Sequence, residues 1–356
     1  MLLLDVLSLP LIDSATHSMA NHYYARKQMI LVMASLVVLA LGTFVDYRDL
    51  VNLSPTLYGI TGVLLVVVLF FGKTVNGSTR WIPLPFFDLQ PSELAKVTMI
   101  LFCAWVLARW EESPSSYIDF GLYYLWALVP MALILKQPDL GTALALMAIT
   151  TGILYFGGAP GRKLARLFTL GVVAIAVVLL LHIYVGLPLP LEDYQISRIT
   201  SLFNPQEDPL GTDYQVLQSK IAIGSGAWWG KGLGKGTQNR LDFIPEQHTD
   251  FVFSVVGEEL GFVKTALVIG VYVVILYRCL LAAVTSPDRK GTLVAGGVLS
   301  LFLFHLLINM GMTMGIMPVT GVPLPFLSHG GSALLVDSFA AGMVLNVGWR
   351  RHKILF

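Results

Sequence analysis

The sequence contains few charged residues. Only 13% of its 356 residues are Asp, Glu, Lys or Arg, whereas soluble domains carry roughly a quarter. The net charge of +1 provides no broad basic surface, so the composition does not predict a nucleic-acid partner. With 55% hydrophobic residues and a mean hydropathy of +0.72, the chain is predicted to be an integral membrane protein.

Cysteine is also scarce. The two cysteines, Cys103 and Cys279, lie in separate apolar runs, which favours packing over a disulfide or a metal site. No cleavable signal peptide is predicted, because the apolar segment Met1–Ile12 lacks a basic start and contains Asp5 and Pro10. The alternating segments of a membrane β-barrel are missing from the sequence.

Apolar runs of about 17–25 residues, the length that crosses a bilayer as a helix, recur along the chain. They predict nine spans, at Gln28–Val45, Pro55–Lys73, Glu93–Trp110, Leu122–Leu135, Gly141–Phe156, Leu167–Val185, Phe251–Leu281, Thr292–Met310 and Gly331–Val347. A tenth, short and interrupted, is predicted at Met1–Asp13. The fold class is therefore all-α and polytopic, a single transmembrane domain over residues 1–356, with a large extracellular loop between the seventh and eighth helices.

Basic residues orient these spans, because cytoplasmic connections carry an excess of Lys and Arg. Three clusters fall on one side, namely Arg162, Lys163 and Arg166, then Arg278, Arg289 and Lys290, then Arg350, Arg351 and Lys353. The connections Asn76–Pro91, 187–250 and Gly315–Gly330 then share the outer side. We expect these three polar connections to converge there.

The 187–250 interval is the longest polar stretch and holds eight of the chain's 22 acidic residues. It ends in Pro245–Asp250, directly before the apolar run that begins at Phe251. Glu246, His248 and Asp250 would share one face of an extended chain, which weakly suggests a divalent-cation site. Asp250 could alternatively cap the following helix.

Ionisable side chains near lipid are costly and tend to be functional. Glu93 and Lys96 follow Pro91, a residue suited to a first helical turn, and would share one helix face at i, i+3. They predict either an internal salt bridge or the polar wall of a substrate cavity. Trp81 is either an interfacial anchor or a platform for a sugar, with Arg80 beside it for a phosphate.

Two further segments have alternative interpretations. Asp139 either caps the helix that follows it or takes part in binding a cation or an acceptor hydroxyl. Asp213–Ile223 resembles a short interfacial amphipathic helix. The glycine-rich stretch Gly224–Gln238 is no Walker loop, but its amides, with Lys231 and Lys235 as point charges, could hold an anion. Otherwise it is a flexible turn whose two tryptophans lie among lipid headgroups. The residues alone predict a polar cavity at the outer face, which fits a transporter as well as an enzyme.

Taken together, these motifs resemble the SEDS family of polytopic peptidoglycan polymerases, which includes RodA, FtsW and SpoVE. The resemblance covers roughly Gln28 to Arg351. It rests on Arg80-Trp81, Gln90-Pro91-Ser92-Glu93 with Lys96, Gln137–Thr142, Asp208–Gly211, Gln218–Gly226, Pro245-Glu246 with His248-Thr249-Asp250, Glu258–Gly261, and the Gly315, Pro318, Gly321–Phe326 and Ser328–Ser332 signature. Gly236-Thr237-Gln238 is more similar to the RodA branch. Two departures are His329, where the family usually has Tyr, and the irregular first span.

The resemblance implies a ten-helix lipid II glycosyltransferase of the bacterial inner (plasma) membrane, with its active site facing outside. It implies Asp250 as the essential carboxylate and Trp81, Glu93 and Lys96 as cavity residues. The partner implied is a monofunctional class B penicillin-binding protein. On this reading Asp250 is the base, and Arg80, Lys96, Arg198 and Lys231 are candidates for the diphosphate, with Mg²⁺ or Mn²⁺ as an optional cofactor. Further substrate-binding candidates are Asp139, Gln218, Ser219 and His248. The alternatives are a lipid II flippase and a non-catalytic scaffold for the transpeptidase.

Overall fold

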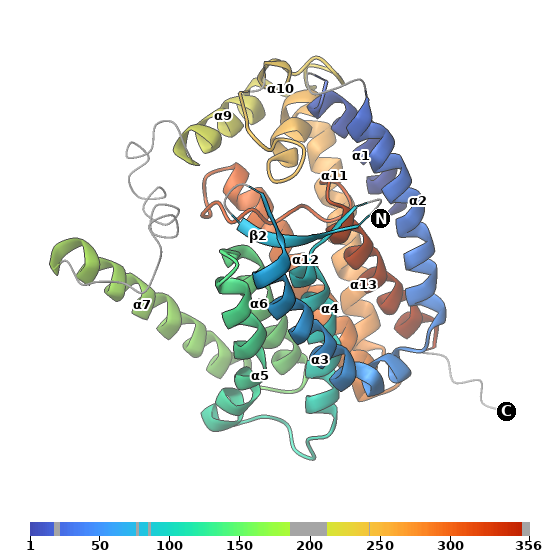
Figure 1. The fold of residues 1–356 in the computed structure, drawn as a ribbon, viewed down its shortest axis with the longest axis vertical. Coiled ribbons are helices and arrows are strands. Elements are labelled where there is room, and N and C mark those ends of the chain that lie inside the picture. The colour runs from blue at the N-terminus through green and yellow to red at the C-terminus, as the bar shows by residue number, and fades with distance from the viewer. Residues whose placement is uncertain (18–21, 76–77, 85–86, 186–211, 242, 351–356) are drawn as a thin grey trace.

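The computed structural model describes residues 1–17, 22–75, 78–84, 87–185, 212–241 and 243–350 (Figure 1). Helices account for most of them. The helices are α1 (Leu2–Ala15), α2 (Tyr23–Phe44), α3 (Tyr47–Phe71), α4 (Pro91–Ala108), α5 (Tyr117–Leu135), α6 (Leu140–Phe156), α7 (Gly161–Val185), α9 (Thr212–Ser225), α10 (Thr237–Arg240), α11 (Val252–Val284), α12 (Arg289–Thr313) and α13 (Gly331–Trp349).

Among the described residues, seven helices are long and apolar enough to cross a membrane, namely α2, α3, α4, α5, α11, α12 and α13. The apolar helix α6 is shorter, at 17 residues, and α7 has 25 residues. Each of the nine predicted spans falls on a helix. The predicted Met1–Asp13 span is the helix α1, whose 14 residues rise only about 21 Å at 1.5 Å each.

Several helices begin earlier in the chain than the apolar runs predict. α3 begins at Tyr47, eight residues before the predicted Pro55, because Asp46 caps it by accepting from the Arg48 amide at 2.9 Å. α12 begins at Arg289 for the same reason, with Asp288 accepting from the Gly291 amide at 2.8 Å. Polar caps and charged first turns are invisible to a search for apolar runs, although they satisfy the orphan amides of a helix.

Helices α4 and α12 lie inside the bundle. In the most apolar window of α4, 78% of the residues are buried, against 22% for α3. Helix α2 packs along α13, and α7 extends away from the other helices on one side of the molecule (Figure 1). Polar groups on α4 and α12 are therefore surrounded by protein rather than by lipid.

The helices alternate in direction, which gives the bundle two distinct ends. We call one the loop end, where α3, α5 and α12 finish and α4, α6, α11 and α13 begin. The predicted basic clusters are at the opposite end as far as the structure describes them, at the start of α7, at the α11–α12 connection and after α13. Residues 351–356 lie outside the described part of the chain.

At the loop end, the connection between α3 and α4 forms a small antiparallel sheet in the order β1-β2-β3. Its strands are Lys73–Val75, Ser78–Pro83 and Asp88–Leu89. β1 pairs with β2 through Thr74 and Thr79, and β2 pairs with β3 through Pro83 and Asp88. These strands, which were not predicted from the sequence, hold Arg80 and Trp81 in a fixed position.

The glycine-rich stretch after α9 wraps around the first turns of α11. One carboxylate oxygen of Glu258 accepts from the Lys231 ammonium at 2.6 Å and from the amides of Thr237 and Gln238 at 2.8 and 3.1 Å. Glu259 accepts from the Gly234 amide at 3.2 Å and from the hydroxyl of Ser14 in α1. The anion that this loop binds in the structure is thus supplied by the protein itself, and Lys231 is its counter-ion.

Gly261 permits this arrangement. It adopts φ +73° within α11, where the helix kinks, a conformation that costs residues with a side chain about 1–3 kcal/mol. A Cβ atom built on it would lie 2.1 Å from the Gly230 amide nitrogen. The loop therefore approaches the kink at a distance that only glycine allows.

The first prediction tests this contact. We expect Gly261→Ala to lower the apparent unfolding temperature of the detergent-solubilised protein, because it adds both backbone strain and a backbone clash. Gly270→Ala in the same helix is the matched control, since its Cβ would meet nothing within 4 Å. Equal melting temperatures for the two variants would contradict the proposed role of Gly261.

Candidate active site

A cavity of about 440 Å³ opens at the loop end of the bundle. All three predicted polar connections contribute to its wall, through Arg80 and Trp81 of the first, Asp250 of the second, and Gly321 and Gly330 of the third. Helices α4, α9 and α12 add Glu93, Lys96, Gln215 and His305. The predicted convergence of the three connections is confirmed for the residues that the structure describes.

The turn that carries Asp250 is closely held. The carbonyl of Glu246 accepts the amides of Thr249 and Asp250, each at 3.1 Å, so the segment is a helical turn rather than an extended strand. The side-chain amide of Asn309 donates to the Asp250 carbonyl at 2.9 Å and to the Val322 carbonyl at 2.8 Å. One buried amide on α12 thus joins the Asp250 turn to the connection before α13.

Asp250 does not occupy the cap position of α11. That position belongs to Phe251, and its side chain makes no capping hydrogen bond. The half-buried Asp250 carboxylate instead borders the cavity beside Gly321. Gly321 has a φ of +71°, and a Cβ atom added to it would lie 3.2 Å from Asp250 Oδ2. Hydrogen bonds therefore hold the Asp250 backbone in place, and the carboxylate forms part of the cavity wall.

Glu93 and Lys96 lie on one face of α4, as their spacing predicts. Lys96 Nζ is 2.7 Å from Glu93 Oε2 and 3.3 Å from His305 Nε2. Lys96 is only 1% exposed, yet both residues line the cavity. The predicted internal salt bridge is therefore present, and the same pair also forms part of a polar cavity wall.

Arg80 and Asp139 close another side of the cavity. The Arg80 guanidinium donates to the carbonyls of Gln137, at 2.7 Å, and Pro138, and it lies 3.9 Å from Asp139 Oδ2. Asp139 accepts from the Thr142 amide at 3.1 Å and so caps α6, as one interpretation proposed. Trp81 lies beside them on the cavity wall.

Four other predicted residues, Gln218, Ser219, Lys231 and His248, are not part of the cavity wall. Ser219 donates to the Thr313 carbonyl at 2.8 Å and fastens α9 to the end of α12, with Gln218 beside it on α9. Lys231 pairs with Glu258, as described above. His248 turns toward Tyr24 and His329. Arg198 lies outside the described residues.

His248 and His329 form an aromatic cluster with Tyr24 of α2. Their ring centroids are 5.8 Å apart, and His329 Nδ1 lies 2.8 Å from Gln28 Oε1. The His329 amide also donates to the His248 carbonyl at 2.8 Å. Burial lowers the pKa of His329 to about 3, with further lowering by His248 and Lys27, and burial likewise lowers the pKa of His248.

The expectation of a shared cation site on Glu246, His248 and Asp250 does not fit this geometry. Because the segment is a turn, His248 points away while Glu246 and Asp250 both line the cavity. In the described parts of the chain, no three His, Cys, Asp or Glu side chains gather closely enough to hold a metal ion.

Sequence reasoning missed His305 and Asn309. Both are polar residues inside a predicted span, four positions apart and hence on one face of α12. The rule that led to Glu93 and Lys96, that polar groups within a span are seldom idle, would have found them.

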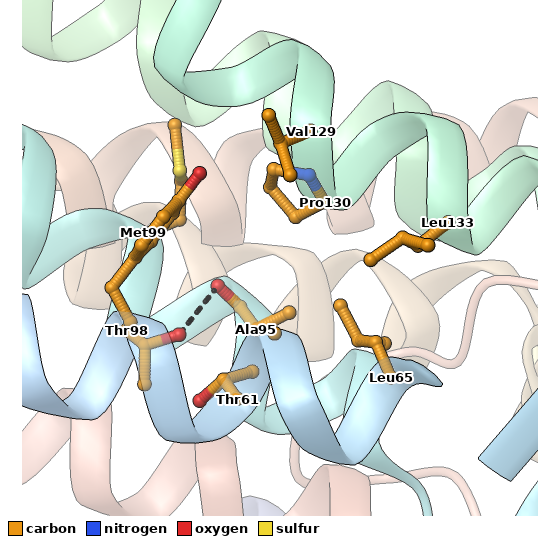
Figure 2. Close-up of a pocket in the computed structure, with 10 residues that line it drawn as sticks. Thr61, Leu65, Ala95, Thr98, Met99, Val129, Pro130 and Leu133 are labelled. Atoms are coloured by element: carbon orange, nitrogen blue, oxygen red, sulfur yellow. Dashed lines mark hydrogen bonds between the residues drawn. The ribbon is translucent and has the colours of Figure 1, made fainter. Parts of the chain in front are cut away.

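A second, small cavity of about 20 Å³ lies between α3, α4 and α5 (Figure 2). Its wall is mostly apolar, and Thr98 in it donates to its own helix.

A bundle of apolar helices with a polar cavity at one end defines a polytopic membrane protein that brings polar groups to a site at the membrane boundary. The chain belongs to the FtsW/RodA/SpoVE family, described as cell cycle proteins, which matches residues 1–353.

Two relatives are equally similar to the chain. It is 36% identical over 329 residues to a probable peptidoglycan glycosyltransferase FtsW of Trichlorobacter lovleyi, covering 91% of this chain and 83% of that protein. It is also 36% identical over 325 residues to the peptidoglycan glycosyltransferase MrdB of Escherichia coli K12, covering 91% and 85%. A chain from a solved peptidoglycan synthase complex, concerned with the coordination of polymerization and crosslinking, superposes with a TM-score of 0.81 at 29% identity, covering 98% of this chain and 96% of that one.

The second prediction tests whether water reaches the cavity. The native thiols should not react with a hydrophilic maleimide in lipid nanodiscs, because Cys103 and Cys279 are 0% and 3% exposed. Gln215→Cys, on the cavity wall, should be labelled, whereas Ile60→Cys on the apolar surface of α3 should not. Labelling of Ile60→Cys without labelling of Gln215→Cys would contradict a water-filled cavity.

The third prediction concerns pH. A histidine of the unfolded chain has a pKa of about 6.5, so below that pH it binds a proton that folded His329 cannot accept. The stability that neutral His329 provides is present above pH 6.5 and is lost as the pH falls toward 3.

The expected result is that His329→Tyr reduces the drop in apparent unfolding temperature between pH 7 and pH 5. His17→Tyr, which replaces an exposed histidine, should leave that drop unchanged. An identical pH dependence in wild type and His329→Tyr would contradict the assignment.

Proposed function

We propose that this protein is a peptidoglycan glycosyltransferase that polymerises lipid II into glycan strands. The observation that supports it most directly is the polar cavity, in which the Asp250 carboxylate, Trp81 and the Glu93–Lys96 pair face one enclosed space at the membrane boundary. Membership of the FtsW/RodA/SpoVE family and the names of the two relatives support the same activity.

The proposed reaction is an in-line substitution at a sugar carbon. The 4-hydroxyl oxygen of the GlcNAc of an incoming lipid II forms a bond to the anomeric carbon of the donor glycan. The bond from that carbon to undecaprenyl diphosphate breaks, and its electron pair leaves with the diphosphate. The hydroxyl proton passes to the Asp250 carboxylate, which acts as general base. An α-linked donor that yields a β-1,4 bond inverts configuration in this single step.

The held position of Asp250 suits such a base. Its backbone is fixed by Asn309 and by the turn at Glu246, so the carboxylate does not have to be ordered when the acceptor arrives. The cationic candidates for the diphosphate, Arg80, Lys96 and Lys231, are each engaged by protein carbonyls or carboxylates in the structure. A divalent cation that accompanies the diphosphate remains a prediction.

For the membrane arrangement, we propose ten spans in one domain, formed by α1 to α7 and α11 to α13. The basic residues at the end opposite the cavity support an orientation in which the cavity faces the outside of the plasma membrane. Both lipid substrates keep their polyprenyl tails in the bilayer, so the reacting sugars would meet the cavity at the outer interface.

We further propose a monofunctional class B penicillin-binding protein as partner and cell elongation as the process served. The similarity to a chain from a synthase complex that couples polymerization with crosslinking supports such a partner. The elongation role rests on the RodA-like Gly236-Thr237-Gln238 segment.

The fourth prediction is that Asp250→Asn abolishes the glycan ladder formed from labelled lipid II by the purified protein with its partner. The substitution removes the proton acceptor and nearly preserves its size, and loss of a general base typically costs about 10²–10⁴-fold in rate. Asp49→Asn, at an exposed site at the opposite end of the bundle, is the control and should polymerise normally.

The same assay separates the proposal from its rivals. A lipid II flippase would move labelled lipid II across liposomes without forming glycan, and a scaffold would do neither. Full polymerisation by Asp250→Asn would remove Asp250 from the mechanism. Absence of polymerisation by the wild-type complex would end the proposed function.

A further inference from the structure

His329 connects the turn that carries Asp250 with the cavity wall. Its backbone amide donates to the carbonyl of His248 at 2.8 Å, two residues before Asp250. Its side chain lines the same cavity as the Asp250 carboxylate, although the residue is only 8% exposed. The His329 ring is therefore held close to the segment that supplies the proposed base, and what its two nitrogens can bind depends on where the ring carries its hydrogen.

A buried chain of hydrogen bonds fixes that hydrogen. The Ser8 hydroxyl has a single hydrogen, which it donates to the Asp5 carbonyl at 2.7 Å. Ser8 Oγ must therefore accept at its 3.2 Å contact with Gln28, so the Gln28 atom that faces Ser8 is the amide nitrogen. The Gln28 side-chain oxygen then faces His329 Nδ1 at 2.8 Å. Because that oxygen can only accept, Nδ1 of His329 carries the hydrogen.

The second ring nitrogen is left as a hydrogen-bond acceptor. Burial lowers the pKa of His329 to about 3, so at pH 7 the ring is neutral and has one N–H group, the one that Gln28 binds. No described residue donates to Nε2 of His329, and this atom is not sealed inside the protein, as the unpartnered Nδ1 atoms of His248 and His305 are.

The lone pair of this nitrogen faces the cavity. The His329 ring forms part of the cavity wall, whereas Gln28 does not. The two nitrogens of an imidazole point in divergent directions, so the ring edge that bonds Gln28 is turned away from the cavity and Nε2 is directed toward it. Water can donate to Nε2 until a ligand takes its place.

An accessible lone pair selects one kind of ligand group. It accepts from an O–H or N–H group, whereas an anionic phosphate oxygen has no hydrogen to donate and is repelled by it. Sugar hydroxyls and acetamido groups supply such donors. The low pKa of His329 also makes the ring a weak proton acceptor at pH 7, which suits binding rather than general-base catalysis.

We propose that His329 is a further substrate-binding residue, whose Nε2 atom accepts a hydrogen bond from a hydroxyl or acetamido N–H group of the acceptor sugar. Since the His329 backbone is bonded to the turn that carries Asp250, this contact orients the sugar whose 4-hydroxyl passes its proton to Asp250. The inference deepens the proposed function and rests on it.

Binding of two probes tests this assignment. One is undecaprenyl diphosphate that carries the lipid II disaccharide without its peptide, and the other is undecaprenyl diphosphate alone. In His329→Phe, which keeps an aromatic ring but has no acceptor, we expect the Kd for the disaccharide probe to rise about tenfold, equivalent to about 1.4 kcal/mol. The Kd for undecaprenyl diphosphate should not change.

Two further variants separate binding from a structural effect. His329→Tyr supplies a hydroxyl oxygen as acceptor, so it should restore most of the affinity for the disaccharide probe. His17→Phe replaces an exposed histidine and should bind both probes like the wild type. The same Kd for the disaccharide probe in His329→Phe and in the wild type would overturn the inference.

A measurement on the wild type does not depend on how the variants fold. With ¹⁵N-labelled histidine, the His329 resonances are identified by their absence from the spectrum of His329→Tyr. At pH 7, Nδ1 should resonate as a protonated nitrogen and Nε2 as an unprotonated one. The Nε2 resonance should move toward the protonated range when the disaccharide probe binds, and it should not move with undecaprenyl diphosphate.

The spectra can also contradict the inference. A protonated Nε2 in the free protein would show that the hydrogen-bond chain has been assigned wrongly. An equal response of Nε2 to both probes would show that it does not bind the sugar. If the wild-type complex polymerises lipid II while either result is obtained, the sugar contact is wrong and the proposed function stands.

Discussion

The arrangement of the site depends on one side-chain amide buried among helices. Asn309 donates to the carbonyls of Asp250 and Val322, two residues that are 72 positions apart in the sequence. Both carbonyls belong to connecting backbone, one just before α11 and the other midway between α12 and α13, and leaving them unpaired inside the protein would be costly. By satisfying both, Asn309 lets irregular backbone line a cavity inside a membrane protein. The hydroxyl of Ser328 adds a second link, because it donates to the Thr249 carbonyl at 2.6 Å.

The same principle governs the polar groups that line the cavity. Lys96 is nearly inaccessible to solvent but has a carboxylate and an imidazole as partners, and Arg80 has two carbonyls and a carboxylate. Buried charges persist when they are paired and hydrogen-bonded. The cationic positions of the cavity wall are therefore held in place by their protein partners.

Much of this architecture could be predicted from the sequence, because the signals were strong. Each of the nine apolar runs coincides with a helix of the structure. The high cost of placing ionisable side chains near lipid led to Glu93, Lys96 and Asp250. The turn at Pro245–Asp250 could not be predicted, since spacing alone does not distinguish an extended segment from a helical turn, and this choice decides where His248 points. The ion pair of Lys231 could not be predicted either, because Glu258 lies 27 residues further along the chain. Only the fold brings Glu258 Oε1 to 2.6 Å from Lys231 Nζ.

The internal carboxylates of α11 also constrain the order in which the protein assembles. Residues 226–238 precede Glu258 and Glu259 in the chain, so their amides have no carboxylate partner until α11 has followed them. The carboxylates, in turn, must remain near the membrane surface until the glycine-rich segment closes over them, because an isolated buried carboxylate is strongly unfavourable. Insertion of α11 and closure of this segment are thus coupled.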